Sequence, residues 1–282
     1  MPELPEVETV RLTLLPLIKN KKIISVDIFY ENIIKNASVL EFKEKLINQT
    51  FLDILRFGKY LVFVFENSFL ISHLRMEGKF YLKHNENKDI HEHVRFYLDS
   101  GETLRYNDVR KFGTMNIFSN ISLTDLLKIK PLNQLGYEPF DPKLNSTYLK
   151  NKFKHSNRPI KSMLLDQSII AGLGNIYVDE VLFLSKINPL KKAKDINEEQ
   201  LQLIIDSSID TLLKAIKLGG TTIHSFSSDG ISGKFQNELL VHTKNTCPIC
   251  RSNILKIKVG GRGTYFCPVC QKGKGDAIWL LD

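Results

Sequence analysis

The sequence predicts an α+β protein in which one N-terminal helix and a β-sandwich precede a helical region and a small cysteine-bearing hairpin. Three observations support this fold class. Short apolar stretches fill the chain as far as about position 132, helical periodicity dominates from about position 133, and all four cysteines lie between positions 247 and 270. Strands and helices in separate runs are typical of the α+β class.

The first helix is predicted from about Pro5 to Ile18. Apolar residues recur there at helical spacing, at positions 7, 10, 14 and 17. Pro5 suits a first helical turn, because an N–H at that position has no intrahelical partner to lose. The start MPELPEVETV is therefore explained only in part, since Pro2 and Glu3 stand ahead of any predicted helix.

Strands are predicted for the apolar segments that follow. Short polar breaks such as ENS and DSGE separate these segments, as in a run of antiparallel strands. The segments are KIISVDIFY, FLDILRFG, KYLVFVF, FLISHL, HVRFYLD and GTMNIFS. A β-rich N-terminal domain, arranged as a sandwich, is the natural interpretation.

A linker is predicted at PLNQLGYEPFDP, where proline and glycine interrupt the pattern. Helical segments follow: STYLKNKFKHS, PIKSMLLDQSI, NIYVDEVLFLSKI and NEEQLQLIIDSSIDTLLKAIKLGG, the last ended by two glycines. We therefore expect a β-sandwich domain at 1–132, a helical domain at 133–232 and a cysteine-bearing domain at 233–272. For the tail at 273–282 the sequence predicts no role.

The composition favours an anionic partner. Lys and Arg number 39 against 31 Asp and Glu, which gives a net charge of +8. Such a balance favours nucleic acid ahead of a membrane surface, although a solvated, lysine-rich surface is the alternative. No secretory signal opens the chain, and its longest apolar runs fall far short of the ~20 residues of a membrane span. We expect a cytosolic protein with reduced thiols.

The four cysteines form a C-x2-C-x16-C-x2-C array: Cys247, Cys250, Cys267 and Cys270. Two tight pairs can place four thiolates around a tetrahedral Zn²⁺, whereas two disulfides or a chance array are the alternatives. Because all four ligand positions are filled, we expect one structural zinc ion. Between the pairs, Thr264 to Phe266 indicate a β-hairpin, on which Lys256, Lys258 and Arg262 could touch phosphate. Many zinc ribbons, however, bind only protein.

Several motifs occur together in one order along the chain. PELPEVE opens it, DVRKFG, LGYEP and AGLGNIY follow, and QNEL precedes the cysteines. Together they resemble the formamidopyrimidine-DNA glycosylases, bifunctional bacterial enzymes that excise oxidised purines. The resemblance runs from Pro2 to about Lys272. It implies a catalytic sandwich domain, a DNA-binding helix–two-turn–helix domain and a C-terminal zinc finger.

The resemblance implies five catalytic residues. Pro2, exposed after removal of the initiator methionine, would be an amine nucleophile, and Glu3 the acid that protonates the opening sugar. Glu6 would support the site, although it could simply complement the dipole of the helix start. Lys59 would assist β-elimination and Arg262 would grip a phosphate in δ-elimination. A solvated surface lysine is the alternative for Lys59.

The resemblance also implies a wedge that fills the gap left by an extruded base. Met76 in HLRMEG, with Arg110 and Phe112 in DVRKFG, matches this pattern. An apolar wedge replaces lost stacking, and arginine can bond to the orphaned base. Burial of Met76 and Phe112 in the core is the alternative. Glu77 beside the wedge would face the flipped base.

DNA-binding residues are implied at three further positions. Asn175 in AGLGNIY begins a predicted helix, and His91 in HEHV matches a phosphate contact, with His93 an equal alternative. Lys161 in RPIKSML matches another basic residue near the site. The segment GGTTIHSFSSDGISGKFQNEL resembles a lid over the extruded base, with His224 where many members have Lys or Arg.

These implications define one functional hypothesis with two rivals. We expect a DNA glycosylase and AP lyase that removes 8-oxoguanine and formamidopyrimidines from duplex DNA through a Schiff base at Pro2, followed by β,δ-elimination. Double-stranded DNA with oxidised bases or AP sites would be the partner of a monomer in the bacterial cytosol, with no membrane partner. The endonuclease VIII branch, which prefers oxidised pyrimidines, usually starts PEGPE and lacks the full wedge. A non-catalytic zinc-containing DNA-binding protein is the second rival.

Overall fold

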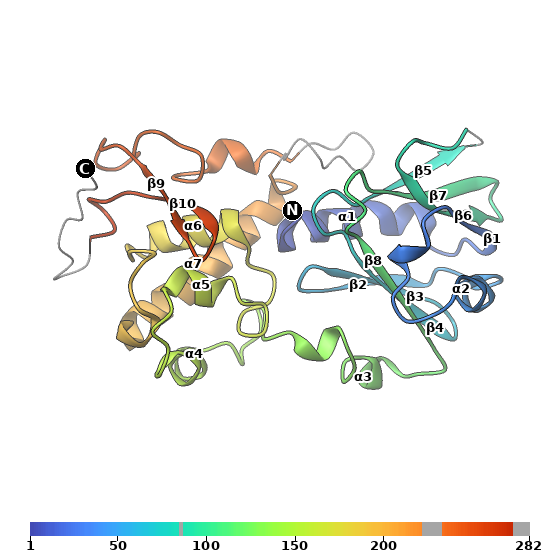
Figure 1. Ribbon diagram of the computed structural model, residues 1–282, viewed down its shortest axis with the longest axis horizontal. Helices are drawn as coiled ribbons and strands as arrows, with labels where there is room; N and C mark the ends of the chain where they lie inside the picture. Colours follow the sequence, from blue (N-terminus) through green and yellow to red (C-terminus); the bar gives the residue numbers. More distant parts are fainter. Residues whose placement is uncertain (85–86, 222–232, 273–282) are drawn as a thin grey trace. The chain divides into compact units, whose positions relative to one another are not determined.

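The structure, a computed structural model, describes residues 1–84, 87–221 and 233–272 (Figure 1). The described residues of 1–133 and 215–236 form one compact unit, and those of 134–214 and 237–282 form a second. Most of the lid segment with His224, and the tail at 273–282, lie outside the described residues.

Helix α1 (Leu4–Ile18) opens the first unit, one residue earlier than predicted. One face of α1 is completely or almost completely buried, at Val7, Val10, Leu14 and Ile18. This helix exists because its apolar residues recur on one face, which packs into the core of the unit.

Eight strands form two antiparallel four-stranded sheets around that core. The first sheet has the order β1-β6-β7-β5, from β1 (Ile23–Ile28), β6 (Glu92–Leu98), β7 (Glu102–Asn107) and β5 (Lys79–His84). The second has the order β2-β3-β4-β8, from β2 (Asp53–Phe57), β3 (Tyr60–Val64), β4 (Ser68–His73) and β8 (Thr114–Ser119). Apolar residues of both sheets and of α1 share one core, as expected of a sandwich.

Helix α2 (Val39–Leu46) was not predicted. Its signal is a capping box: the Ser38 hydroxyl accepts from the Glu41 N–H, and the Glu41 carboxylate accepts from the Ser38 N–H. The remaining short elements of this region are a 3₁₀ turn, η1 (Glu31–Ile33), and helix α3 (Leu123–Leu126). The 3₁₀ turn η1 and helix α2 lie between β1 and β2, and α3 follows β8, the last strand of the two sheets.

The helices that follow the sandwich lie where the sequence places them, and most of their residues belong to the second unit. They are α4 (Ser146–Phe153), α5 (Ile160–Leu164), α6 (Asn175–Leu184) and α7 (Glu198–Lys217), with 3₁₀ turns η2 (Leu132–Gln134), η3 (Ala193–Asp195) and η4 (Phe235–Glu238). Gly219 and Gly220 end α7 with φ of 75° and 76°, and the Gly220 N–H bonds to the Ala215 carbonyl.

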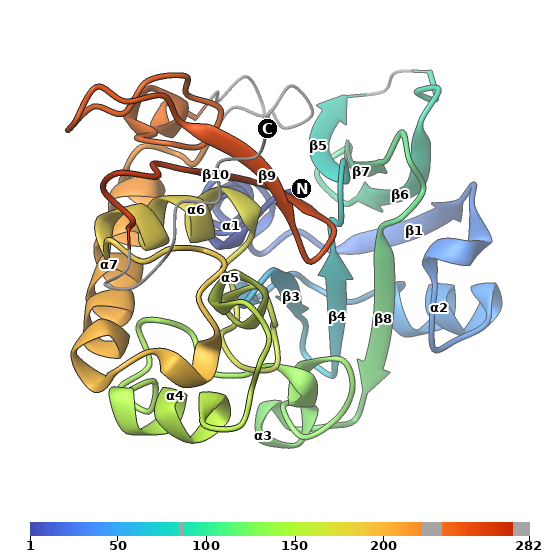
Figure 2. The same ribbon diagram turned by 60° about the vertical axis from the view of Figure 1, so that its left-hand side comes forward.

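A β-hairpin completes the second unit. Strand β9 (Leu255–Val259) pairs antiparallel with β10 (Arg262–Phe266), with Arg262 opposite Val259. Strand β10 lies beside α6 (Figure 2). The predicted α+β class, with an N-terminal helix, a sandwich, a helical region and a C-terminal hairpin, is confirmed.

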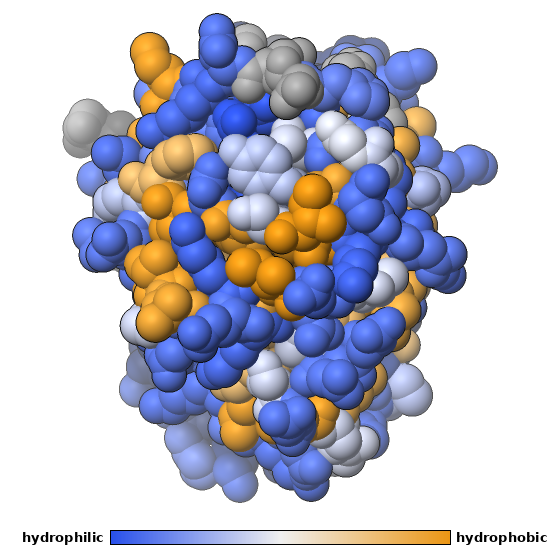
Figure 3. Space-filling model, turned by 90° about the vertical axis from the view of Figure 1, so that its right-hand side faces the viewer, coloured by the Kyte–Doolittle hydropathy of each residue, from blue (hydrophilic) through white to orange (hydrophobic). Residues whose placement is uncertain are grey.

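Hydrophilic side chains cover most of the face seen in Figure 3, and apolar side chains gather near its middle. Leu12, Ile24 and Leu40 are among the exposed apolar residues of the first unit. None of the described helices combines the length and the apolar character that crossing a bilayer requires.

Candidate active site and nucleic-acid interface

The first residues of the chain are buried and tied down. Pro2 and Glu3 are buried ahead of α1, and the carboxylate of Glu6 is completely buried. Glu6 Oε2 accepts from the Glu3 N–H at 2.8 Å. Glu6 Oε1 accepts from the Thr221 N–H at 2.8 Å and from its hydroxyl at 3.1 Å. Glu6 therefore does more than complement a helix dipole: it joins the start of the chain to the segment after α7.

The electrostatic surroundings favour a neutral amine at the start of the chain. Burial lowers the pKa of the terminal amine, which here belongs to Met1, while the carboxylates of Glu3 and Glu6 oppose this shift. The ammonium of Lys59 lowers the same pKa further, and Glu77 raises it. An amine of lowered pKa carries more of the neutral, nucleophilic form at cellular pH. The charges of four residues that the sequence singled out, Glu3, Glu6, Lys59 and Glu77, therefore act on the amine at the start of the chain.

Lys59 lies in the tight turn between β2 and β3, where Gly58 has a φ of 57°. Only 4% of its surface is exposed, so it is not a solvated surface lysine. The turn is short because Phe57 pairs directly with Tyr60. This geometry delivers the ammonium to the interior side of the first unit, near the chain start.

The predicted wedge residues lie on two loops of the first unit. Met76, half-buried, is on the loop between β4 and β5, and Arg110 and Phe112 are on the turn between β7 and β8. Phe112 is 51% exposed, and the Arg110 guanidinium lies 4.7 Å from the centre of its ring. Phe112 is therefore not a core residue, and its exposed ring is available for stacking.

Asp108 and Tyr106 contact the backbone of these loops, Asp108 through its carboxylate and Tyr106 through its hydroxyl end. Asp108 accepts the Arg110 N–H on Oδ1 at 3.0 Å and the Gly113 N–H on Oδ2 at 2.8 Å. Tyr106 is fully buried; a Cβ added at Gly78 would lie 2.2 Å from its hydroxyl, and one at Gly113 only 1.7 Å away. Burial and the Asp108 carboxylate both raise the pKa of Tyr106. Tyr106 and Asp108 were not singled out from the sequence, although an aspartate opening a turn is a recognisable signal.

His73 supports the Met76 loop as a neutral ring. Burial, with the charges of Arg75 and Lys59, lowers its pKa to about 3. Its Nδ1 accepts the Arg75 N–H at 2.9 Å, and Arg75 has a φ of 54°. The ring also meets Tyr60 edge-on, with centroids 4.5 Å apart. A neutral His73 thereby fixes the turn that precedes Met76.

The two candidate histidines differ clearly in their exposure to solvent. His91 is exposed, whereas His93 is 4% exposed and its Nε2 lies 2.7 Å from the Asp108 carbonyl oxygen. The ring of His93 also packs on Tyr30, with centroids 5.3 Å apart. Of the two, His91 is the residue that a phosphate could reach.

In the second unit, Lys161 and Asn175 hold the hairpin. Lys161 is completely buried, and its ammonium donates to Asp179 Oδ1 at 2.7 Å and to the Gly263 carbonyl at 3.0 Å. These two internal partners favour an internal role for Lys161, and its place among the DNA-binding residues stays a prediction. Asn175, the first residue of α6, donates from Nδ2 to the same Gly263 carbonyl at 2.9 Å.

Arg262 is exposed at the start of β10, next to the hairpin turn. It lines a cavity of about 420 Å³ together with Arg158, Ser162 and Gly260. Arg158 is paired with Asp166 at 3.2 Å, which leaves Arg262 as the basic side chain best placed to grip an anion there.

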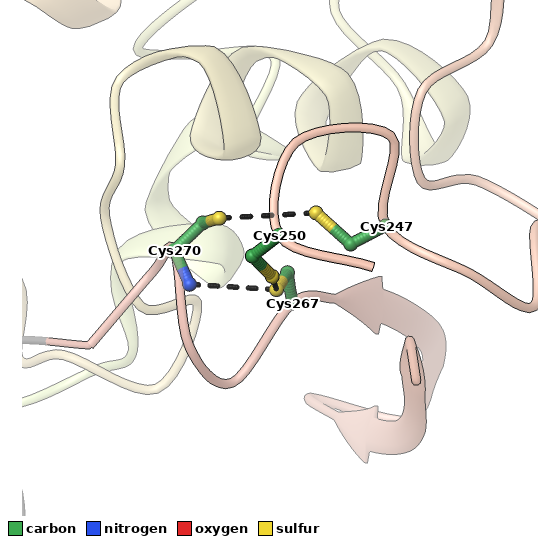
Figure 4. A group of neighbouring side chains, drawn as sticks. All are labelled: Cys247, Cys250, Cys267 and Cys270. Atoms are coloured by element: carbon green, nitrogen blue, oxygen red, sulfur yellow. Dashed lines mark hydrogen bonds between the residues drawn. The ribbon is translucent and has the colours of Figure 1, made fainter. Parts of the chain in front are cut away.

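The four cysteines gather at the base of the hairpin (Figure 4). Their sulfur atoms all lie within 4.8 Å of one another, at 3.8 Å between Cys247 and Cys270 and 3.4 Å between Cys250 and Cys267. Tetrahedral zinc–thiolate bonds place sulfurs about 3.8 Å apart, so the residues fit one Zn²⁺. All four thiols are free, and the disulfide alternative is wrong. The chain has one structural zinc site.

Sequence models of known families match three parts of the chain. The formamidopyrimidine-DNA glycosylase N-terminal domain matches residues 1–115, and the H2TH domain of the same glycosylases matches residues 135–227. A zinc finger found in FPG and IleRS matches residues 244–273. A formamidopyrimidine-DNA glycosylase of Oceanobacillus iheyensis is 47% identical over 97% of this chain and 99% of its own length. The chain belongs to the formamidopyrimidine-DNA glycosylase family.

Other members of the formamidopyrimidine-DNA glycosylase family agree with this assignment. The Cytobacillus firmus relative is 46% identical over 96% of this chain and its whole length. A Lactococcus lactis FPG mutant, solved in complex with a Fapy-dG containing DNA, has a TM-score of 0.90 and 42% identity, and covers 96% of this chain and 100% of its own. A Lactococcus lactis Fpg complex with an abasic site containing DNA has a TM-score of 0.89, with the same identity and coverage.

Proposed function

We propose that the protein is a DNA glycosylase and AP lyase that removes 8-oxoguanine and formamidopyrimidines from duplex DNA. The observation that carries this proposal is the buried start of the chain, where burial lowers the pKa of the Met1 amine and the charges of Glu3, Glu6 and Lys59 act on it. Family membership supports the substrate class, because solved relatives hold DNA with a Fapy-dG or an abasic site.

The proposed reaction begins after removal of Met1. The neutral amine of Pro2 attacks C1′ of the damaged nucleotide, the glycosidic bond breaks, and the base leaves with a proton. Glu3 protonates the ring oxygen as the sugar opens, which leaves a protein–DNA iminium. Lys59 assists loss of the 3′ phosphate by β-elimination, and Arg262 grips the phosphate that leaves by δ-elimination. Water then hydrolyses the iminium, which releases the remaining sugar as an unsaturated aldehyde and restores the Pro2 amine. A one-nucleotide gap and a free enzyme remain.

The wedge and phosphate contacts complete the proposal. Met76, Arg110 and Phe112 would occupy the space of the extruded nucleotide, because an apolar surface and a planar cation replace its stacking and pairing. His91 and the N-terminus of α6 at Asn175 would contact backbone phosphates. Lys161 would act from inside, through the hairpin that carries Arg262.

The relatives are bacterial, which supports a place for this protein in the bacterial cytosol, bound to the nucleoid when engaged on DNA. We propose that it works there as a monomer. The zinc ion holds the finger and takes no part in the chemistry, because all four of its ligand positions are filled by cysteines.

Borohydride trapping tests the proposal. The untagged protein, freed of Met1, is incubated with duplexes that contain 8-oxoguanine or thymine glycol, and the adduct is located by mass spectrometry. We expect an adduct at Pro2 with 8-oxoguanine. Absence of any adduct would refute the enzyme proposal, and an adduct with thymine glycol alone would transfer the protein to the endonuclease VIII branch.

A blocked N-terminus is the matched control. An extra residue ahead of Pro2 converts its amine into an amide, which cannot form an iminium. We expect that variant to bind the duplex and to leave both strands intact. Strand cleavage at the normal rate would exclude Pro2 as the nucleophile.

A further inference from the structure

Asp179 is a buried acid at the centre of a network in the second unit. Its carboxylate, on α6, has no exposed surface. Oδ1 accepts from the Lys161 ammonium at 2.7 Å, and Oδ2 accepts from the Tyr265 N–H at 3.1 Å. His242 Nδ1 lies 2.8 Å from Oδ2, and its ring meets Tyr265 edge-on at 5.0 Å. One side chain therefore links α5, α6, the segment before the zinc finger and β10.

The segment that carries His242 is itself fixed to α6. Glu180, next to Asp179, accepts from the Val241 N–H at 3.0 Å and from the His242 N–H at 2.8 Å. The Leu240 N–H donates to the same carboxylate at 2.7 Å. His242 therefore approaches Asp179 from a rigid backbone and restricts where that carboxylate can point.

Strand β10 is held at alternate residues. The Gly263 carbonyl accepts from Asn175 and Lys161, and the Tyr265 N–H donates to Asp179. Alternate residues of a strand share one backbone edge, so these bonds fix both the register and the tilt of β10. Arg262 immediately precedes the first of these held residues. A shift of Gly263 therefore displaces the backbone of Arg262, from which the guanidinium extends.

Asp179 holds this edge in two ways. It bonds directly to the strand at Tyr265, and it orients the Lys161 ammonium whose other bond goes to Gly263. Loss of the negative charge leaves a buried ammonium without its counter-ion, and such an ammonium must move or lose its proton. Both responses weaken the support at Gly263.

We propose that Asp179 is a positioning residue for Arg262, and that it sets how efficiently the second, δ-elimination step follows the first. This inference rests on the proposed lyase function. Asp179 touches no substrate; it acts through the hairpin. Attack by the amine and β-elimination depend on residues of the first unit, so the proposal separates the two steps of strand cleavage.

The test uses Asp179→Asn in the full-length, zinc-loaded protein on a duplex with one AP site. The amide keeps the size of the side chain but removes the negative charge that faces the buried Lys161 ammonium. We expect the δ product relative to the β product to fall by about 10- to 100-fold, the range expected for a small displacement of a positioned group. Borohydride trapping should stay within about twofold of wild type.

Two further variants make the test specific. Asp206→Asn removes an exposed acid of the same unit and should leave the product ratio unchanged. Lys161→Met keeps the Asp179–Tyr265 bond but removes one donor to Gly263, and should give an intermediate loss of δ product. Zinc content and circular dichroism are measured for each variant to check folding. If Asp179→Asn does not fold, the δ-to-β product ratio of Lys161→Met tests the proposal in its place.

An unchanged δ-to-β ratio in Asp179→Asn would overturn the inference. A parallel loss of trapping, β product and δ product would also overturn it, because a merely structural role lowers all three together. A wild-type protein that forms no adduct at all would instead refute the proposed function on which the inference depends.

Discussion

Substitution of Gly113 by alanine should damage the turn that carries Arg110 and Phe112. An added Cβ would lie 1.7 Å from the hydroxyl oxygen of Tyr106, whereas real Cβ atoms essentially never come closer than 3.0 Å to another heavy atom. The turn or the ring must move by about 1.3 Å, within a fully buried part of the first unit. We expect the free energy of unfolding to fall by about 1–3 kcal/mol, as is typical of overpacking.

The same displacement should also move Arg110 and Phe112, two of the three predicted wedge residues. Arg110 and Phe112 lie on the turn that Asp108 ties to the Gly113 N–H. A shift of about 1 Å in a positioned group can lower a rate by about 100-fold, so we expect excision of 8-oxoguanine to fall by about 10- to 100-fold. Urea unfolding followed by circular dichroism, and single-turnover excision from a labelled duplex, measure the two effects.

A double-mutant cycle with Tyr106→Phe tests the cause. Removal of the hydroxyl abolishes the 1.7 Å contact and leaves the ring carbon at 2.8 Å, so relief should be partial. The double variant should be more stable than the sum of the single effects predicts, by about 1 kcal/mol. Gly263→Ala, where an added Cβ meets nothing within 4 Å, should cost less than about 0.5 kcal/mol. Additive costs in the cycle would refute the steric explanation.

Three further predictions follow from the titratable groups and the metal. Burial lowers the pKa of the Met1 amine, and we expect the same direction for the Pro2 amine once Met1 is removed, because Pro2 is also buried. The trapping rate should then rise with pH through a midpoint below the ordinary value of about 8; a midpoint well above 8 would contradict this. The pKa of His73 falls to about 3 on folding, so the unfolded chain protonates first as pH drops. As pH falls from about 6.5 to 3, the free energy of unfolding of wild type should decrease by about 1.4 kcal/mol per pH unit relative to that of His73→Gln. The free energy is measured by urea unfolding at each pH. If the two proteins show the same dependence on pH, the linkage to His73 is excluded. Removal of zinc by a chelator should unfold the finger and abolish DNA binding, which a gel-shift assay measures and added zinc should restore.

Much of the fold was predictable because its signals are local. The buried face of α1 follows from the spacing of its apolar residues, and the end of α7 follows from two glycines that reach positive φ. The zinc site follows from cysteine spacing alone. Helix α2 was missed because only two of its residues, Phe42 and Leu46, are buried, too few for a clear periodic pattern.

The residues that support the site were harder to predict because their partners are distant in the sequence. Asp179 meets Tyr265 across 86 positions, and no local pattern distinguishes it from a solvated helical acid. Lys161 could be recognised as basic, but its burial depends on the same network. His73 stands in an apolar strand, where sequence alone does not indicate that its ring stays neutral.

The bond between Glu6 and Thr221 has a consequence for how the protein is made. The two residues are separated by 215 positions, so the ribosome synthesises Thr221 about 10–40 s after Glu6. During that interval the first residues lack the partner that fixes them, whereas in the folded chain Pro2 is buried. An aminopeptidase needs Met1 and Pro2 extended and accessible. We therefore expect maturation of the N-terminus to be a co-translational event, completed before the polypeptide's own later residues enclose it.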